Sequence, residues 1–189
     1  MKHLTASDLW PLPVYEGVRQ QFRAEVIEAK KSRRVTVGPY MTFIFENRLT
    51  VKFQIQEILR IERIVEPGQV NQEVEGFNTM LPDAGELSAT LLIELTGKDE
   101  DVKAELHKLY GLSRHIWLEV SGKRIAGEVE SGREEEARGA AAVQYLRFKA
   151  KDPQALLNGP AFLIVDHPSY NHRLELSEAV RRSLAQDLQ

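Results

Sequence analysis

The sequence predicts a single α+β domain over residues 1–189, with a mostly antiparallel sheet, a buried central helix and several packing helices. Three observations support this class. Helical and alternating segments follow one another without the regular strand–helix–strand order of a parallel sheet. Short turn signals, such as Gly38-Pro39 and Ser121-Gly122, separate alternating segments and indicate hairpins. A length of 189 residues with 42% hydrophobic content supports one core and leaves no room for two substantial domains.

The first elements are two helices and a hairpin. Thr5 and Asp8 have the spacing of a helix start, and two prolines separate that start from a longer helix. The longer helix should run from about Val14 to Lys31, because apolar residues recur there at every third or fourth position. Residues 35–45 alternate on either side of Gly38, which predicts two short strands.

The segment between Phe45 and Ile64 predicts the central helix, with Asn47 as its cap. At about 100° per residue, Val51, Ile55, Ile58, Leu59 and Ile61 form one apolar sector, and Leu49, Phe53 and Ile64 lie roughly opposite. A helix with two apolar sides is normally sandwiched between other elements.

Glu62 falls at the centre of an apolar sector of this helix. An isolated buried carboxylate costs more free energy than a fold can spare, so we expect Glu62 to have a partner, a proton or a metal. One interpretation is an internal salt-bridge network with Arg48, Arg60 or Arg63. The other is a ligand or proton-transfer carboxylate.

The remaining elements follow in order. They are a helix through Val70, Val74, Phe77 and Leu81, a strand over 87–95, a helix over 99–110, a hairpin of 115–120 and 124–129, a solvated charged loop over 130–139, a strand over 142–149, a short helix over 153–157, a buried strand over 161–165 and a final helix over 177–188.

The segment from Asp166 to His172 is expected to be a loop after a buried strand, where functional groups often gather. With a carboxylate at Glu62 or Glu46, it would suit iron, manganese or zinc. The spacing of its two histidines matches no recognised ligand pair, and a plain turn is the alternative interpretation. The candidate metal ligands are Glu62, His115, His167, Tyr170 and His172.

Composition excludes several classes of function. The absence of cysteine excludes disulfides, thiolate catalysis and a cysteine-ligated cluster. A net charge of −3 predicts no nucleic-acid partner, and the basic residues between Lys30 and Arg34 are interpreted as a solvated face at a helix end. Nucleotide-binding glycine loops and serine-nucleophile motifs are missing. Without a signal segment or an apolar run of bilayer length, the chain is expected to be soluble and cytoplasmic, with no membrane insertion.

Five blocks carry a resemblance to a known family: Phe45-Glu46-Asn47-Arg48, Gln54-Ile55-Gln56-Glu57 with Glu62-Arg63, Gly85-Glu86-Leu87-Ser88-Ala89-Thr90-Leu91, Val143-Gln144-Tyr145-Leu146-Arg147-Phe148 and Asp166-His167-Pro168-Ser169-Tyr170. Over essentially the whole chain they resemble the uncharacterised bacterial family called domain of unknown function 3501. Members are often encoded beside a rubrerythrin and an iron–sulfur protein similar to a heterodisulfide reductase subunit. The resemblance therefore implies a peroxide-defence or electron-transfer setting, and it supplies no catalytic residues.

Two functions follow as hypotheses. The first is a cofactor-free accessory protein that docks with the rubrerythrin-like and heterodisulfide-reductase-like partners through its helices and charged loop. The second is a small metal- or haem-dependent enzyme that uses the histidine and carboxylate candidates. Self-association as a homodimer is a further arrangement that the sequence leaves open.

Overall fold

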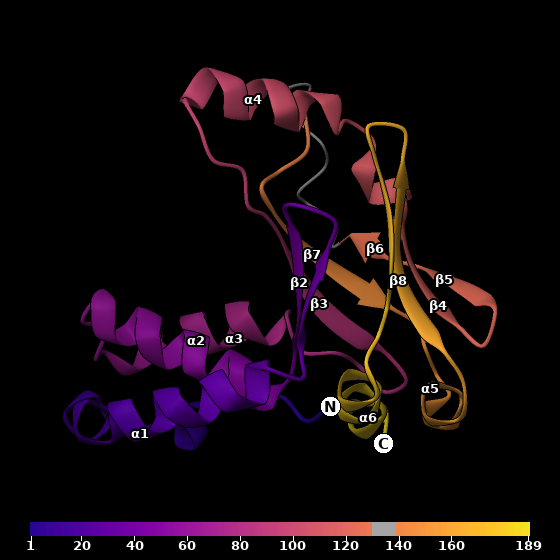
Figure 1. The fold of residues 1–189 in the computed structure, drawn as a ribbon. Helices are drawn as coiled ribbons and strands as arrows, with labels where there is room; N and C mark the ends of the chain where they lie inside the picture. Colours follow the sequence, from indigo (N-terminus) through magenta and orange to yellow (C-terminus); the bar gives the residue numbers. More distant parts are fainter. Residues whose placement is uncertain (130–138) are drawn as a thin grey trace.

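The computed structural model describes residues 1–129 and 139–189, and it shows two antiparallel sheets with a group of helices at one side (Figure 1). The predicted α+β class is confirmed. We call the two sheets with their covering helices the β region. The three remaining helices, together with residues 1–11, form the helical arm. No helix in the described residues has the length and apolar content that crossing a membrane requires.

The first sheet has five strands in the order β1-β2-β3-β7-β6. Their bounds are β1 (Arg34–Val37), β2 (Met41–Glu46), β3 (Leu87–Ile93), β6 (Glu128–Val129) and β7 (Val143–Phe148). The hairpin expected around Gly38 is confirmed, because β1 pairs with β2 in antiparallel register.

The second sheet has four strands in the order β5-β4-β8-β9. Their bounds are β4 (Ile116–Val120), β5 (Lys123–Ala126), β8 (Ala161–His167) and β9 (Tyr170–Glu175). The chain passes from this sheet to the first at Gly127, whose amide donates to the Ile116 carbonyl at 2.8 Å. A Cβ at position 127 would lie 3.0 Å from the Phe148 ring, so glycine permits this close passage.

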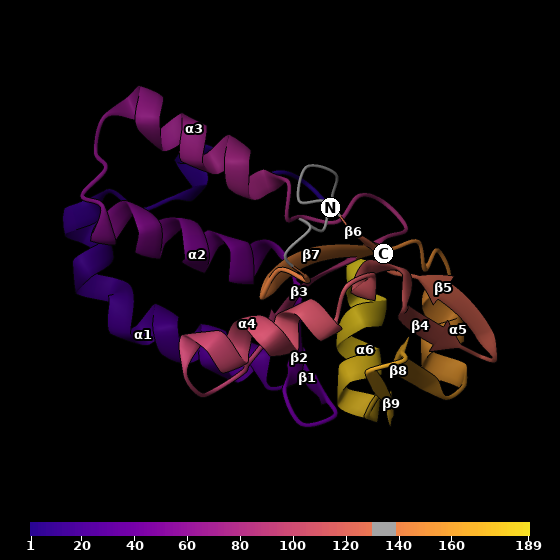
Figure 2. The ribbon, with the colours of Figure 1, turned by 90° about the horizontal axis from the view of Figure 1, so that it is seen from above.

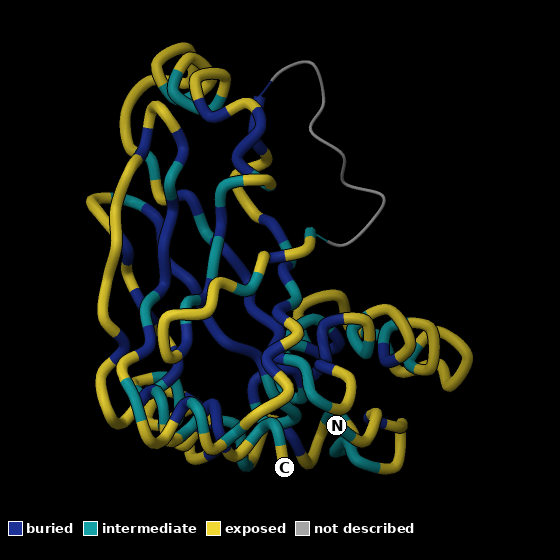
Figure 3. Tube along the Cα trace, turned by 90° about the vertical axis from the view of Figure 1, so that its right-hand side faces the viewer, coloured by how far each residue is buried: buried dark blue, intermediate teal, exposed yellow. Residues whose placement is uncertain are grey.

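One continuous hydrophobic core joins the two sheets. Phe43 and Leu91 of the first sheet belong to the same buried cluster as Leu118 and Leu163 of the second. Three helices cover the β region: α4 (Asp99–Lys108), α5 (Pro153–Asn158) and α6 (Glu178–Asp187). Figure 1 places α4 and α6 at opposite ends of the strands. Buried residues concentrate along the strands, and exposed residues mark the outer sides of the helices (Figure 3).

The arm consists of α1 (Leu12–Lys30), α2 (Arg48–Ile61) and α3 (Pro67–Asn78), and α2 is the middle helix (Figure 2). α2 has two apolar sides as predicted, but Ile61 is exposed and Ile64 packs on the side of Ile55 and not with Leu49 and Phe53. Leu49 and Phe53 pack in one cluster with residues of α1. Ile55 and Leu59 belong to a second cluster that includes Val74 of α3.

The structure corrects the expected loop over residues 166–172. Asp166 and His167 end β8, and β9 begins at Tyr170, so the segment is a hairpin. The prediction was wrong because β9 is an edge strand whose residues after Tyr170 are exposed, which removes the apolar alternation that marks a half-buried strand. The charged loop predicted over 130–139 lies outside the described residues, apart from Gly139.

Candidate functional site

His115 and Asp166 form a hydrogen-bonded pair on the side of the second sheet that faces away from the core. Asp166 Oδ1 lies 3.2 Å from His115 Nδ1 and accepts a hydrogen bond from Trp117 Nε1 at 3.0 Å. Arg124 Nη1 donates to Asp166 Oδ2 at 3.0 Å. The side chains of His115 and Asp166 are 34% and 31% exposed, so solvent reaches the pair.

This pairing orients the imidazole of His115. Partial burial opposes ionisation of Asp166, but the hydrogen bonds from Trp117 and His115 and the charge of Arg124 outweigh it, and the pKa of Asp166 falls below its ordinary value. A carboxylate beside Nδ1 favours the tautomer with the proton on Nδ1, which leaves the lone pair on Nε2. The Nε2 lone pair of His115 is therefore oriented so that it could bind one metal ion.

Both ring nitrogens of His167 form hydrogen bonds with backbone groups. Its Nδ1 accepts a hydrogen bond from the Ser169 amide at 3.1 Å, which places the proton on Nε2, and Nε2 donates to the Tyr110 carbonyl at 3.0 Å. Only 4% of His167 is exposed. Although its ring lies edge-on to that of His115, with centroids 5.1 Å apart, neither nitrogen of His167 has a free lone pair in this arrangement.

Tyr170 and His172 share the sheet face of His167, opposite to that of Asp166, and they lie against the β1–β2 hairpin. Tyr170 Oη donates to the Val37 carbonyl at 2.5 Å and accepts from the Tyr40 and Met41 amides at 3.3 Å each. The His172 ring contacts the Tyr170 ring, with centroids 4.5 Å apart. The phenol thus joins the two sheets through backbone groups.

The predicted burial of Glu62 is wrong. α2 ends at Ile61, which is 61% exposed, and Glu62 is its exposed C-cap residue. Glu62 keeps the helical phase, since its amide donates to the Ile58 carbonyl, but at this end of α2 both Ile61 and Glu62 are exposed while Leu59 is still buried. The carboxyl end of α2 and the β8–β9 hairpin lie on opposite sides of the molecule (Figures 1 and 2). The structure therefore does not bring Glu62 to the histidines.

The buried carboxylate near α2 is instead Glu46, which is 2% exposed. Its Oε1 accepts from Thr90 Oγ1 at 2.7 Å, and its Oε2 accepts from Thr50 Oγ1 at 2.5 Å and from Gln54 Nε2 at 3.2 Å. Neutral donors from β3 and α2 thus satisfy this carboxylate. In the sequence, the signal for the burial of Glu46 is its position directly after Phe45, at the end of the segment predicted to be a strand.

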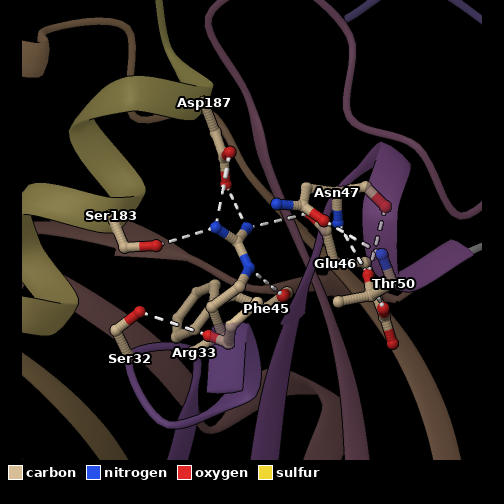
Figure 4. Close-up of polar contacts among 9 residues, drawn as sticks. Ser32, Arg33, Phe45, Glu46, Asn47, Thr50, Ser183 and Asp187 are labelled. Carbon is tan, nitrogen blue, oxygen red and sulfur yellow. Dashed lines mark hydrogen bonds and ion pairs between the residues drawn. The ribbon is translucent and has the colours of Figure 1, made fainter. Parts of the chain in front are cut away.

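Arg33 is also buried, which corrects its assignment to a solvated basic face. Its guanidinium donates to the carbonyls of Phe45 and Glu46 and to Ser183 Oγ, and it forms an ion pair with Asp187 (Figure 4). This cluster fastens α6 to the point where β2 leads into α2. Spacing alone did not reveal it, because its partners come from distant parts of the chain.

The described residues contain no group of three or more histidine, aspartate or glutamate side chains arranged to hold a metal ion. Of the five candidate ligands, His115 offers a free imidazole nitrogen near a carboxylate. His167 and Tyr170 bond to the backbone, the His172 ring packs against the Tyr170 ring, and Glu62 lies in the arm.

The arm contains an apolar groove of about 440 Å³ between the N-terminal segment and the α2–α3 connection. Its walls come from residues 9–13, from the end of α2 and from the first turns of α3. The lining residues are Ala6, Leu9, Trp10, Pro11, Leu12, Pro13, Gln56, Leu59, Ile64, Val65, Pro67, Val70 and Asn71. No sequence pattern predicted this groove, because it joins segments that are not adjacent in the chain.

Comparison with known proteins gives a family and a close fold match. Residues 3–188 match the model of a family described as protein of unknown function (DUF3501). The crystal structure of a protein of unknown function from Burkholderia pseudomallei K96243 is similar, with a TM-score of 0.92, 31% identity and 100% of each chain covered. No curated protein matches. The chain therefore belongs to the DUF3501 family of proteins of unknown function.

Proposed function

We propose that this chain is a cytoplasmic accessory protein of a bacterial redox or peroxide-defence module. It docks with rubrerythrin-like and iron–sulfur partners through its helical arm. The observation that carries the proposal is the apolar surface of the arm: Ile61 is 61% exposed and Val65 is 68% exposed, and Val65 lines the groove. Exposed apolar side chains that adjoin a groove are typical of protein contact sites.

The partners are proposed from the family resemblance, which implies a setting beside a rubrerythrin and an iron–sulfur protein similar to a heterodisulfide reductase subunit. Because the chain contains no cysteine, it has no thiolate ligand for an iron–sulfur cluster. In this proposal the electrons pass between the partners, and the chain brings the partners together.

Co-purification tests the proposal. The tagged full chain is expressed with the two neighbouring proteins, and the retained proteins are measured from about 0.05 to 0.5 M salt, a range over which screening changes strongly. We expect Val65→Asp to reduce retention at least about tenfold. The matched control is Leu174→Asp on β9, where the native side chain is 39% exposed, and it should retain both partners. No retention by the native chain at any salt concentration would contradict the proposal.

A small metal- or haem-dependent enzyme is the second candidate, and one observation favours it. The Asp166 carboxylate lies beside Nδ1 of His115, which is the arrangement that orients many metal-binding histidines. Metal content and the absorption spectrum are measured on tagless protein purified without oxygen. If this candidate is correct, His115→Ala should remove bound metal, and His172→Ala, whose ring contacts Tyr170 instead, is the control and should retain it. Metal content unchanged by His115→Ala would exclude the site.

A further inference from the structure

We infer that the groove in the helical arm binds the apolar face of an amphipathic helix whose flanking positions are basic. This inference rests on the proposed docking function and adds the chemistry of the partner segment.

Contacts within the chain itself form the groove. Gln56 holds the N-terminal segment on α2, because its Oε1 accepts from the Trp10 amide at 2.7 Å and its Nε2 donates to the Trp10 carbonyl at 3.3 Å. Lys52 Nζ lies 3.7 Å from the centre of the Trp10 ring. Three prolines, Pro11, Pro13 and Pro67, stiffen the lining further. A preformed wall reduces the ordering cost of binding.

The polar groups of the groove favour a helix over a small polar ligand. Gln56 already uses both ends of its amide on the Trp10 backbone, so it offers little to a ligand. Leu9, Trp10, Ile64 and Val70 are half-buried, which describes an open trough with apolar walls. Such a trough suits apolar side chains that one helix presents at intervals of three and four residues.

Two walls of the groove, formed by α1 and α3, carry exposed acidic residues. Glu16 lies one helical turn after the lining residue Leu12, and Glu75 lies one turn after the lining residue Asn71, so each shares a helix face with a groove residue. The chain has no lysine or arginine between Arg63 and Lys98, which leaves α3 without a basic residue. Both glutamates are exposed.

The cations of α2 nearest the groove are largely engaged. Lys52 lies over the Trp10 ring, and Arg60 pairs with Glu57. Arg63, after the end of α2, is the exposed cation beside the exposed Glu62. The two acidic walls therefore complement lysine or arginine on both sides of an apolar stripe.

Tryptophan fluorescence gives a direct test, because the chain has two tryptophans and one of them lines the groove. In a Trp117→Phe background, Trp10 becomes the single tryptophan. The probe is a synthetic leucine–lysine peptide of about 18 residues, which is about five helical turns, with leucine along one face. A second peptide keeps the leucines and replaces every lysine with glutamate. We expect the lysine peptide to shift Trp10 emission to shorter wavelength and to bind at least about tenfold more tightly than the glutamate peptide.

Variants separate the apolar and the charged contributions. Val65→Asp should weaken the lysine peptide at least about tenfold, and Leu174→Asp should leave its affinity unchanged. Glu16→Lys with Glu75→Lys should remove the preference for lysine. The charge-matched control, Glu100→Lys with Glu175→Lys, changes exposed residues away from the groove and should preserve the preference. Circular dichroism of each variant confirms that it is folded.

Three results would overturn the inference: equal binding of both peptides, an affinity that Val65→Asp leaves unchanged, or a native dimer that Val65→Asp dissociates, which would make a second copy the occupant. These results are distinct from failure of the proposed function. If the neighbouring proteins co-purify but the lysine peptide does not bind, the inference fails and the docking function stands. If the peptide binds and no neighbour co-purifies, the function fails and the groove chemistry stands.

Discussion

The β region and the helical arm bury their apolar residues in different ways. In the β region, both sheets share one cluster, and side chains such as Phe43 and Phe148 are completely buried. The arm divides its apolar residues between two smaller clusters on either side of α2, and it leaves Ile61 and Val65 exposed. The β region also exposes Tyr110, Leu157 and Leu174, so the regions differ in how their buried residues are grouped and not in whether apolar side chains reach solvent.

Both regions contain buried charge. In the β region, hydroxyl and amide donors satisfy Glu46, and the buried Arg33 pairs with Asp187 of α6. Between α1 and α2 of the arm, Glu57 accepts from Arg19 at 2.8 Å and from Tyr15 Oη at 2.7 Å, with Arg60 at 3.3 Å. The hydrogen bonds from Arg19 and the other partners lower the pKa of Glu57 to about 2. The arm therefore depends on ionic contacts that respond to pH.

The largest effect should come from the core of the β region. Phe148→Ala removes a fully buried ring, so the free energy of unfolding should fall by about 3–5 kcal/mol. Chemical denaturation measures this loss. Leu174→Ala on the edge strand β9 is the control and should cost less than about 1 kcal/mol. Equal losses in the two variants would contradict the assignment of this core.

A substitution that creates a cavity in the arm should destabilise the chain less than one in the core of the β region. Ile55→Ala should cost about 2–4 kcal/mol, because the fully buried side chain packs between α2 and α3. Hydrogen exchange should show faster opening of α2 and α3 amides, with β3 and β8 amides protected as in the native chain. If all four elements lose protection together, the arm and the β region form one cooperative unit.

The ionic cluster of the arm gives a pH-dependent prediction. Glu57 has an ordinary pKa of 4.5 and a folded pKa of about 2, so its stabilising contribution is present above pH 4.5 and is lost as pH falls toward 2. Glu57→Gln should cost on the order of 2 kcal/mol at pH 7, and the difference from the native chain should shrink below pH 4. Thermal unfolding at several pH values measures both effects. A pH-independent difference would exclude this origin.

The smallest of these effects should come from the phenol that joins the sheets. Tyr170→Phe leaves the Val37 carbonyl and two amides without this partner, which should cost about 1–2 kcal/mol by denaturation. Metal content and peptide binding should be unchanged, because the hydroxyl bonds to the backbone. A change in bound metal with native stability would favour the enzyme hypothesis instead.

Much of the fold was predictable because its patterns are local. The Asn47 cap and both hairpin turns agree with the structure, and so do the apolar sides of α2 apart from Ile61 and Ile64. The strand predicted over 124–129 is divided between the two sheets at Gly127. β9 was not predictable from periodicity, because an exposed edge strand lacks alternation. The burial of Glu62 was overestimated because sequence alone did not locate the helix end.

The candidate site was harder to predict because its contacts are distant in the chain. His115 and Asp166 meet only when β4 pairs with β8. His167 carries the same functional group as His115, but backbone partners occupy it. Residue type therefore identified candidate chemistry, and only tertiary structure could separate a free imidazole from a bound one.

The ion pair between Arg33 and Asp187 spans 154 residues of sequence, and it has a consequence for the order of events during synthesis. Until residue 187 has emerged from the ribosome, the guanidinium beneath β2 has no carboxylate to pair with. A buried arginine without its partner costs about 3–5 kcal/mol, so the junction between arm and sheets should close only after translation has passed the last helix. Nascent chains stalled before this point should expose the junction to proteases and to chaperones.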